Sequence, residues 1–94
     1  MPVDGAKHEG GRLLPEIFSD DRWRELADHL GLTPRQQQVA RLICRGLGQL
    51  AIARRLGVSA ATVRWHTEAL FKALEIHDRI GIPVRLILAD RTTT

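Results

Sequence analysis

The segment from Gln49 to Leu74 contains a short series of small and apolar residues at the spacing that a helix-turn-helix requires. The series consists of Ala53, Leu56, Gly57, Val58 and Val63, and Ser59 follows its glycine by two positions. Ala53 lets a second helix cross closely, and Gly57 follows the last turn of the first helix, where a positive φ costs little. The larger apolar residues give the two helices a common pivot, and Ser59 can accept backbone N–H groups at the start of the second helix. The series therefore predicts a helix-turn-helix, a motif typical of DNA-binding proteins.

The residues on both sides of this series carry further motifs in one consistent spacing. They are Leu32-Thr33-Pro34-Arg35, Val39, Leu42-Ile43, Gly46-Leu47, Ile52-Ala53-Arg54-Arg55-Leu56-Gly57-Val58-Ser59, Thr62-Val63-Arg64, His66 and Leu70 to Leu74. Together they resemble the LuxR-type (GerE-like) DNA-binding domain over about two thirds of the chain. The resemblance implies four short helices, of which the third is presented to a DNA major groove and the fourth pairs two subunits. We therefore expect an all-α fold: a four-helix LuxR-type helix-turn-helix domain over residues 32–91, preceded by one additional N-terminal amphipathic helix.

The sequence departs from the pattern of this family at positions that bear on DNA affinity. Family members commonly carry a glutamate soon after Pro-Arg and an Asn-Lys-Glu-like run at the start of the second helix. This chain has Gln36 and Gln49-Leu50-Ala51 there, and Ala73 replaces another frequent basic residue. Because neutralised phosphates supply much of the affinity for DNA, each missing cation weakens binding. We expect binding to be weak unless two copies bind together.

Charge is distributed unevenly along the 94 residues, a length that allows one domain with a small core. Residues 1–32 hold four basic and seven acidic side chains, a net charge of −3. Residues 33–94 hold ten basic and four acidic side chains, a net charge of +6. A basic domain behind an acidic leader suits a polyanionic partner such as double-stranded DNA, which would meet only part of the surface. The same charges would also serve as an ordinary solvated surface.

Several classes of function lack the residues that they need. No apolar run approaches a membrane span and no charged-then-apolar leader follows Met1, so we expect a cytoplasmic protein with no membrane contact. Cys44 is the only cysteine, beside an apolar stripe, and is read as a packing residue. The four histidines, His8, His29, His66 and His77, show no ligand pair at i, i+4, and His66 is read as a packing or hydrogen-bonding residue. With no defensible catalytic motif, the sequence predicts no enzyme, no metal and no cofactor.

The residues before the domain divide into an arm and a helix. Residues 1–17 are rich in glycine and proline and predict a flexible arm. Residues 18–31 predict an accessory amphipathic helix, with Ser19 as N-cap, Phe18 and Trp23 at the spacing of a hydrophobic staple, and Gly31 at its end. Its apolar stripe consists of Trp23, Leu26, Ala27 and Leu30. The stripe packs either on its own domain or on another chain, and the second case would give a protein partner a place to bind.

The first helix of the domain begins after Thr33, with Pro34 at its first position and Gln36 completing a capping box. Val39, Leu42, Ile43 and Leu47 supply its buried face, and Gly46 and Gly48 mark its end.

The helix expected over residues 60–73 is the recognition helix, whose exposed side chains would determine the DNA sequence that the domain binds. Val63, Leu70 and Leu74 share one face with His66 beside them, so the opposite face presents Ala61, Arg64, Trp65, Glu68 and Lys72. Arg64 can form a fork with guanine O6 and N7 or bond a phosphate, and Lys72 can reach only the backbone. Trp65 can press on a thymine methyl or a sugar, or lie half buried. Glu68 can accept from cytosine N4 or orient Arg64. The predicted base-facing residues are Ala61, Arg64, Trp65 and Glu68, and the phosphate candidates are Gln49, Arg54, Arg55 and Lys72.

The last helix differs from what the resemblance implies. The family pattern would start it after Asp78-Arg79, but Pro83 would then clash with the preceding turn, so we expect a start at Gly81 or Ile82. Val84, Ile87 and Leu88 form an apolar stripe on it. The stripe either pairs two chains about a two-fold axis or closes the core of its own domain. We predict a homodimer through these three residues, and a frayed tail over residues 92–94.

Taken together, the sequence predicts a transcription regulator that binds double-stranded DNA through a helix-turn-helix, as a dimer. The alternative function is a helix-turn-helix scaffold that binds another protein, such as a regulator or a polymerase, through Leu50, Trp65 and the helix of Trp23. Ionic strength distinguishes the two, since DNA binding weakens steeply with salt and an apolar contact does not.

Overall fold

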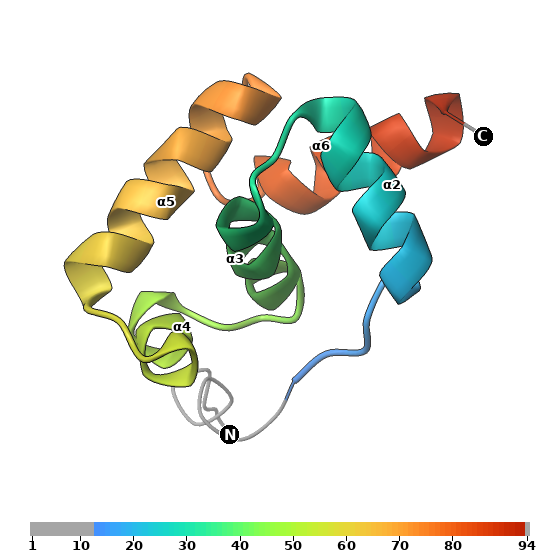
Figure 1. The fold of residues 1–94 in the computed structure, drawn as a ribbon. Helices are drawn as coiled ribbons and strands as arrows, with labels where there is room; N and C mark the ends of the chain where they lie inside the picture. The colour runs from blue at the N-terminus through green and yellow to red at the C-terminus, as the bar shows by residue number, and fades with distance from the viewer. Residues whose placement is uncertain (1–12, 94) are drawn as a thin grey trace, which may run out of the picture.

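The computed structural model describes residues 13–93, and this part of the chain forms five α-helices and no strand. They are α2 (Asp20–Leu30), α3 (Pro34–Cys44), α4 (Gln49–Leu56), α5 (Ala60–Leu74) and α6 (Gly81–Thr92). Figure 1 shows α3 at the centre of the view, with α4 and α5 to its left and α2 to its right, while α6 passes behind. Helix α3 packs against each of the other four helices. The prediction of an all-α fold with one helix before the four-helix unit is confirmed.

Three helices begin at the caps that the sequence predicts. The hydroxyls of Ser19 and Ser59 accept backbone N–H groups in the first turns of α2 and α5. Thr33 forms the capping box at the start of α3, where Gln36 N donates to Thr33 Oγ1 at 3.1 Å and Thr33 N donates to Gln36 Oε1 at 2.9 Å. Each cap satisfies backbone groups that a helix start leaves without partners. Local sequence therefore sets these three boundaries.

Three helices end at a residue in the left-handed conformation. Gly31 after α2 has φ 74° and Gly57 after α4 has φ 70°, as expected of glycine. Glu75 after α5 has φ 58°, which an L side chain rarely adopts. The backbone still closes the same way, since Val58 N donates to Ala53 O at 3.0 Å and Ile76 N donates to Phe71 O at 2.9 Å. Helix α5 thus ends in the left-handed conformation that glycine usually adopts, but the residue there is Glu75.

The core is built from all five helices, and α2 supplies its largest side chain. The largest side chains with less than 2% exposure are Trp23, Leu26, Val39, Ile52, Val63, Leu70, Leu74, Ile82 and Leu86. The ring of Phe18 meets that of Trp23 edge to face at 5.3 Å, as the staple spacing predicts. Trp23 Nε1 donates to Glu16 Oε1 at 3.1 Å, which satisfies the indole inside the protein. The apolar stripe of α2 therefore packs on its own domain.

The segment before α2 is bonded to α3. Leu14 N donates to Arg45 O at 2.9 Å, and Arg45 Nε donates to Leu14 O at 2.7 Å. Arg41 Nη2 donates to Glu16 Oε2 at 3.1 Å and to Asp20 Oδ1 at 2.8 Å. The hydrogen bond between Arg41 and Asp20 lowers the pKa of the Asp20 carboxyl group. A flexible arm was predicted over residues 1–17, and residues 1–12 of it lie outside the described part of the chain. From residue 13 onward its backbone and side chains contact the domain.

Helix α6 begins at Gly81, as the position of Pro83 predicts. Pro83 lies in the first turn, where no intrahelical N–H bond is lost, and Asp78 Oδ1 accepts from Gly81 N at 3.1 Å. A Cβ atom at Gly81 would lie 3.1 Å from the Cβ of Ile76, so the helix start is packed closely on the preceding loop.

At its other end α6 extends into the predicted tail. Thr92 is its last residue, and the hydroxyl of Thr93 donates to Ala89 O at 2.9 Å. The helix therefore passes the boundary predicted at residue 91, and Thr94 lies outside the described residues. Within residues 13–93, none of the helices is long and apolar enough to cross a membrane.

Candidate nucleic-acid interface

Helices α4 and α5 form the turn that the sequence predicts. Ala53 is 6% exposed and Val63 is fully buried where the two helices cross, and Gly57 reverses the chain between them. Gln49 Nε2 donates to Ala60 O at 3.1 Å, which fastens the first turn of α4 to the first residue of α5. Gln49 was predicted to contact phosphate, but its amide is engaged inside the motif. This hydrogen bond joins the two helices, and the motif pattern does not reveal it.

Helix α5 has two faces of opposite character. Val63, Thr67, Leu70 and Leu74 are buried, and Thr67 Oγ1 donates to Val63 O at 2.8 Å so that its hydroxyl is satisfied. Ala61, Arg64, Trp65, Glu68 and Lys72 are all exposed, and we call these five residues the reading face. The helical period predicted both sets, apart from Thr67. The motif therefore presents one face of α5 to a partner and anchors the other.

Trp65 lies on the surface and not against the preceding helix. Its side chain is 66% exposed, and its ring lies edge to face with that of His66, with the centroids 5.1 Å apart. The half-buried alternative for Trp65 does not occur in the structure. His66 itself is partly buried beside the apolar face, which agrees with its interpretation as a packing residue. A large indole exposed on the reading face is free to contact a ligand.

Arg64 and Glu68 lie one turn apart on the reading face. Arg64 Nε is 3.8 Å from Glu68 Oε2, and their side chains are 70% and 65% exposed. A pair this open and this long contributes little to stability, so Arg64 can exchange Glu68 for another anion or acceptor. Both residues line an open cleft of about 290 Å³, which is also lined by His77, Asp78 and Arg79. The loop between α5 and α6 thus adds charged side chains to the interface, a feature that the sequence period of α5 cannot indicate.

The phosphate candidates differ in exposure. Arg54 and Arg55 are exposed in the last turn of α4, and Lys72 is exposed in the last turn of α5. Among residues 13–93 none of these three cations forms an ion pair, whereas Arg22, Arg24, Arg41 and Arg45 are all paired with carboxylates. The cations of the helix-turn-helix are therefore available to an outside anion.

Helix α6 exposes the apolar stripe that the sequence predicts. Val84, Ile87 and Leu88, which we call the pairing stripe, are 53%, 44% and 51% exposed. Ile82, Leu86 and Ala89 on the other side of α6 are buried in the core. The stripe therefore does not close the core of its own domain, and a contiguous apolar patch remains on the surface.

The single thiol of the chain is not a reactive group. Burial raises the pKa of Cys44 to about 12, and the nearby Glu16 carboxylate shifts it in the same direction. A thiol with such a pKa stays protonated at neutral pH and is a poor nucleophile. In the part of the chain that the structure describes, no group of histidine, cysteine and carboxylate side chains could hold a metal ion.

A short helix, a tight glycine turn and a capped second helix with one exposed polar face define a helix-turn-helix domain. Residues 30–85 match the family described as bacterial regulatory proteins, luxR family. The match extends over more than half of the chain, from the last residue of α2 into the first half of α6, and the chain belongs to this family. Helix α2 itself precedes the matched region.

Two curated relatives are bacterial response regulators. The chain is 36% identical over 55 residues to the two-component response regulator PprB of Pseudomonas aeruginosa, covering 58% of this chain and 20% of PprB. It is 37% identical over 53 residues to the nitrate/nitrite response regulator protein NarL of Escherichia coli, covering 56% of this chain and 24% of NarL. The chain thus spans about a quarter or less of the length of these relatives. No solved structure matches it.

Proposed function

We propose that this chain binds double-stranded DNA with α5 in the major groove and regulates transcription from the site that it reads. The observation that carries the proposal is the reading face, in which Arg64, Trp65, Glu68 and Lys72 are all exposed on the side of α5 away from its buried residues. A helix fits the major groove of B-form DNA, where each base pair presents a distinct pattern of donors and acceptors. Two response regulators among the relatives support a regulatory role.

The base-facing residues differ in what they can recognise. Arg64 can bond guanine O6 and N7 once it releases Glu68, since both side chains are open to solvent. Trp65 supplies apolar contact to a thymine methyl or a sugar, and Glu68 accepts only from a base that offers an amino group, such as cytosine. Ala61, at the start of α5, leaves room for the helix to enter the groove. We expect Arg64, Trp65 and Glu68 to set sequence preference.

The unpaired cations give the proposed binding its affinity. Arg54, Arg55 and Lys72 are exposed without ion pairs, so each can neutralise one phosphate. Two copies would then make about six such contacts, which corresponds to a slope of log affinity against log salt of about −5. One hydrogen bond of the Gln49 amide goes to Ala60 O, so its predicted contact with phosphate would use the second N–H.

Pairing through α6 completes the proposal. The pairing stripe is exposed and apolar, and a second copy of the same stripe about a two-fold axis would cover it. The two reading faces must then enter successive major grooves on one side of the duplex, roughly 34–36 Å apart, which corresponds to about 10 base pairs between half-site centres. The preferred site is therefore an inverted repeat.

Selection of random duplexes by the purified chain at low and at physiological salt tests the proposal. We expect an enriched inverted repeat and a steep fall of affinity with salt. Arg55→Gln should weaken binding to all duplexes alike and make the salt slope shallower by about one per copy, since it removes one phosphate contact. Arg24→Gln on α2, whose guanidinium pairs with Asp21 at 2.9 Å, is the matched control and should change neither. Absence of binding at low salt would overturn the proposal.

A second function is favoured by two exposed apolar side chains. Leu50 on α4 is 61% exposed and Trp65 on α5 is 66% exposed, and both are large apolar side chains. The alternative is a protein-binding module that uses these two residues. Trp23 drops out of that surface, because it is fully buried in the core. Binding to a protein through Leu50 and Trp65 would respond little to salt, which separates the two functions.

A further inference from the structure

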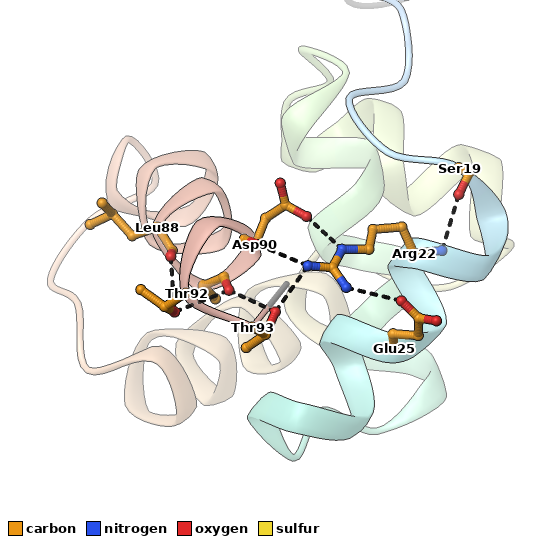
Figure 2. A network of polar contacts seen from close by, with 8 residues as sticks. Ser19, Arg22, Glu25, Leu88, Asp90, Thr92 and Thr93 are labelled. Atoms are coloured by element: carbon orange, nitrogen blue, oxygen red, sulfur yellow. Dashed lines mark hydrogen bonds and ion pairs between the residues drawn. The ribbon is translucent and has the colours of Figure 1, made fainter.

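The last turn of α6 is bonded to α2 through one guanidinium, that of Arg22 (Figure 2). Arg22 Nε donates to Asp90 Oδ1, and Nη2 donates to the backbone carbonyl of Asp90 at 2.8 Å and to Thr93 Oγ1 at 2.9 Å. Nη1 donates to Glu25 Oε1 on α2 at 3.0 Å, which holds the guanidinium in place. We call Arg22, Glu25, Asp90 and Thr93 the Arg22 network. The hydrogen bond with Asp90 raises the pKa of Arg22, whose guanidinium is charged at neutral pH in any case.

The Arg22 network supplies what the end of α6 lacks. The last carbonyls of a helix have no partner within it, and they carry the negative end of the helix dipole. Arg22 donates to one of these carbonyls and to a side chain in the same turn, so a planar group with fixed donors holds α6 at two points. The side chains of Arg22 and Asp90 are 21% and 34% exposed, so water screens them less than an open surface pair. These bonds oppose rotation of α6 about its own axis at its C-terminal end.

The Arg22 network holds α6 from the side opposite the pairing stripe. Successive residues of a helix are about 100° apart, so Leu86, Asp90 and Thr93 fall on one side and Val84, Ile87 and Leu88 on the other. Leu86 is buried and the pairing stripe is exposed, which agrees with this division. A rotation of α6 by one residue would turn the stripe away from the direction that a second copy must meet.

The Arg22 network also lies outside the region that matches the family. The match covers residues 30–85, whereas Arg22 and Glu25 precede it and Asp90 and Thr93 follow it. The two flanking segments of this chain thus contact each other across the domain. Their contact bears on α6, which the proposed function assigns to pairing.

We propose that Arg22 is a positioning residue for pairing: by holding the last turn of α6 against α2, it sets the orientation in which two copies can bind an inverted repeat. The inference rests on the proposed function. Helix α2 then has a role beyond its share of the core, since it determines whether the pairing stripe faces a second copy.

The experiment compares two labelled duplexes, each carrying the half-site found by selection, either once or as an inverted repeat. Arg22→Gln in the full chain removes the forked contact with α6. We expect it to weaken binding to the inverted repeat by about tenfold or more, while binding to the single half-site stays within about twofold. Arg24→Gln removes the same charge from the same helix without touching α6, and both affinities should stay at the parent values. Arg22→Lys, which keeps the charge but not the fork, should also lose the preference for the repeat.

Circular dichroism establishes that each variant is folded, and if Arg22→Gln loses helix, Arg22→Lys decides the comparison. A Gln or Lys variant that keeps the parent ratio of the two affinities would overturn the inference. So would an equal loss on both duplexes, because that result means that Arg22 only stabilises the fold. If the parent chain binds neither duplex, the proposed function itself fails, and the inference with it. That outcome differs visibly from a parent that binds the repeat and an Arg22 variant that binds it equally well.

Discussion

At the scale of single residues, Arg64 tests what the reading face does. Its only ion pair among residues 13–93 is with Glu68 at 3.8 Å, so it can turn to a base without breaking a strong contact. If Arg64 forms a fork with guanine, Arg64→Ala should cost about 1–3 kcal/mol on the preferred duplex and relax the preference at one base position. Titration of the selected duplex and a scrambled one measures both effects. An equal loss on the two duplexes would assign Arg64 to a phosphate instead.

Glu75 is a second single residue with a measurable consequence. It has φ 58° at the end of α5, a conformation that costs an L side chain about 1–2 kcal/mol, and its negative charge lies at the unfavourable end of the helix dipole. Glu75→Gly should therefore stabilise the chain by about 1 kcal/mol and raise its melting temperature by roughly 4–8 °C.

Glu75→Gln is the matched control for that change, because it removes the charge and keeps the backbone strain. We expect it to recover only a minor part of the gain in a thermal unfolding series. A glycine variant that melts at or below the parent temperature would be incompatible with strain at this position.

At the scale of elements, Gly57 holds the turn between α4 and α5. A Cβ atom at this position would meet no other atom within 4 Å, so only the positive φ of 70° opposes a side chain. Gly57→Val should cost on the order of 1–3 kcal/mol of stability, measured by denaturant unfolding. Gly57→Asn, which tolerates this conformation better, should cost less. If Val and Asn variants unfold at the parent midpoint, the turn does not depend on glycine.

The elements also show which features the sequence could predict. Each predicted cap, Ser19, Thr33 and Ser59, accepts from a backbone N–H three residues away, and the start of α6 follows from Pro83 nearby. Such local rules need no knowledge of the fold. Other contacts depend on the packed structure. They are the hydrogen bond from Gln49 to Ala60 and the Arg22 network, in which Arg22 and Asp90 are 68 residues apart in the sequence. The sequence contains those residues but not their proximity.

The residues of the candidate site also divide into those that the sequence predicts and those that only the packed structure reveals. Periodicity predicted every member of the reading face, since exposure on α5 follows from the helical repeat and the position of its apolar residues. Periodicity left open whether Trp65 is exposed, because an indole suits a core and a surface equally well. It also missed the loop wall of His77, Asp78 and Arg79, which only the path of the chain after α5 brings beside Arg64.

At the scale of the whole molecule, the pairing stripe predicts an oligomeric state. If Val84, Ile87 and Leu88 pair two chains, Leu88→Glu places two like charges across the two-fold axis and should abolish the dimer. Because Leu88 is 51% exposed in the single chain, the monomer should remain folded. Sedimentation of the parent and the variant, free and on DNA, measures the change.

Leu50→Glu introduces the same charge at another exposed leucine, outside the stripe, and serves as the control for the free protein. A parent that stays monomeric at high concentration and on its DNA would rule out pairing through α6. A Leu88 variant that unfolds would instead show that the covered half of this side chain stabilises its own domain.

The two tryptophans of the chain give it two separate optical reporters. Trp23 is fully buried, bonded to Glu16 and covered by Arg41 at 5.5 Å, while Trp65 stands 66% exposed on the reading face. The emission of Trp23 should be blue-shifted and hardly quenched by iodide, and that of Trp65 red-shifted and readily quenched. Duplex binding should protect Trp65 alone, and unfolding should expose Trp23, so Trp65→Phe separates the two signals. A single sample without any attached dye can then follow occupancy of the reading face and integrity of the core at the same time.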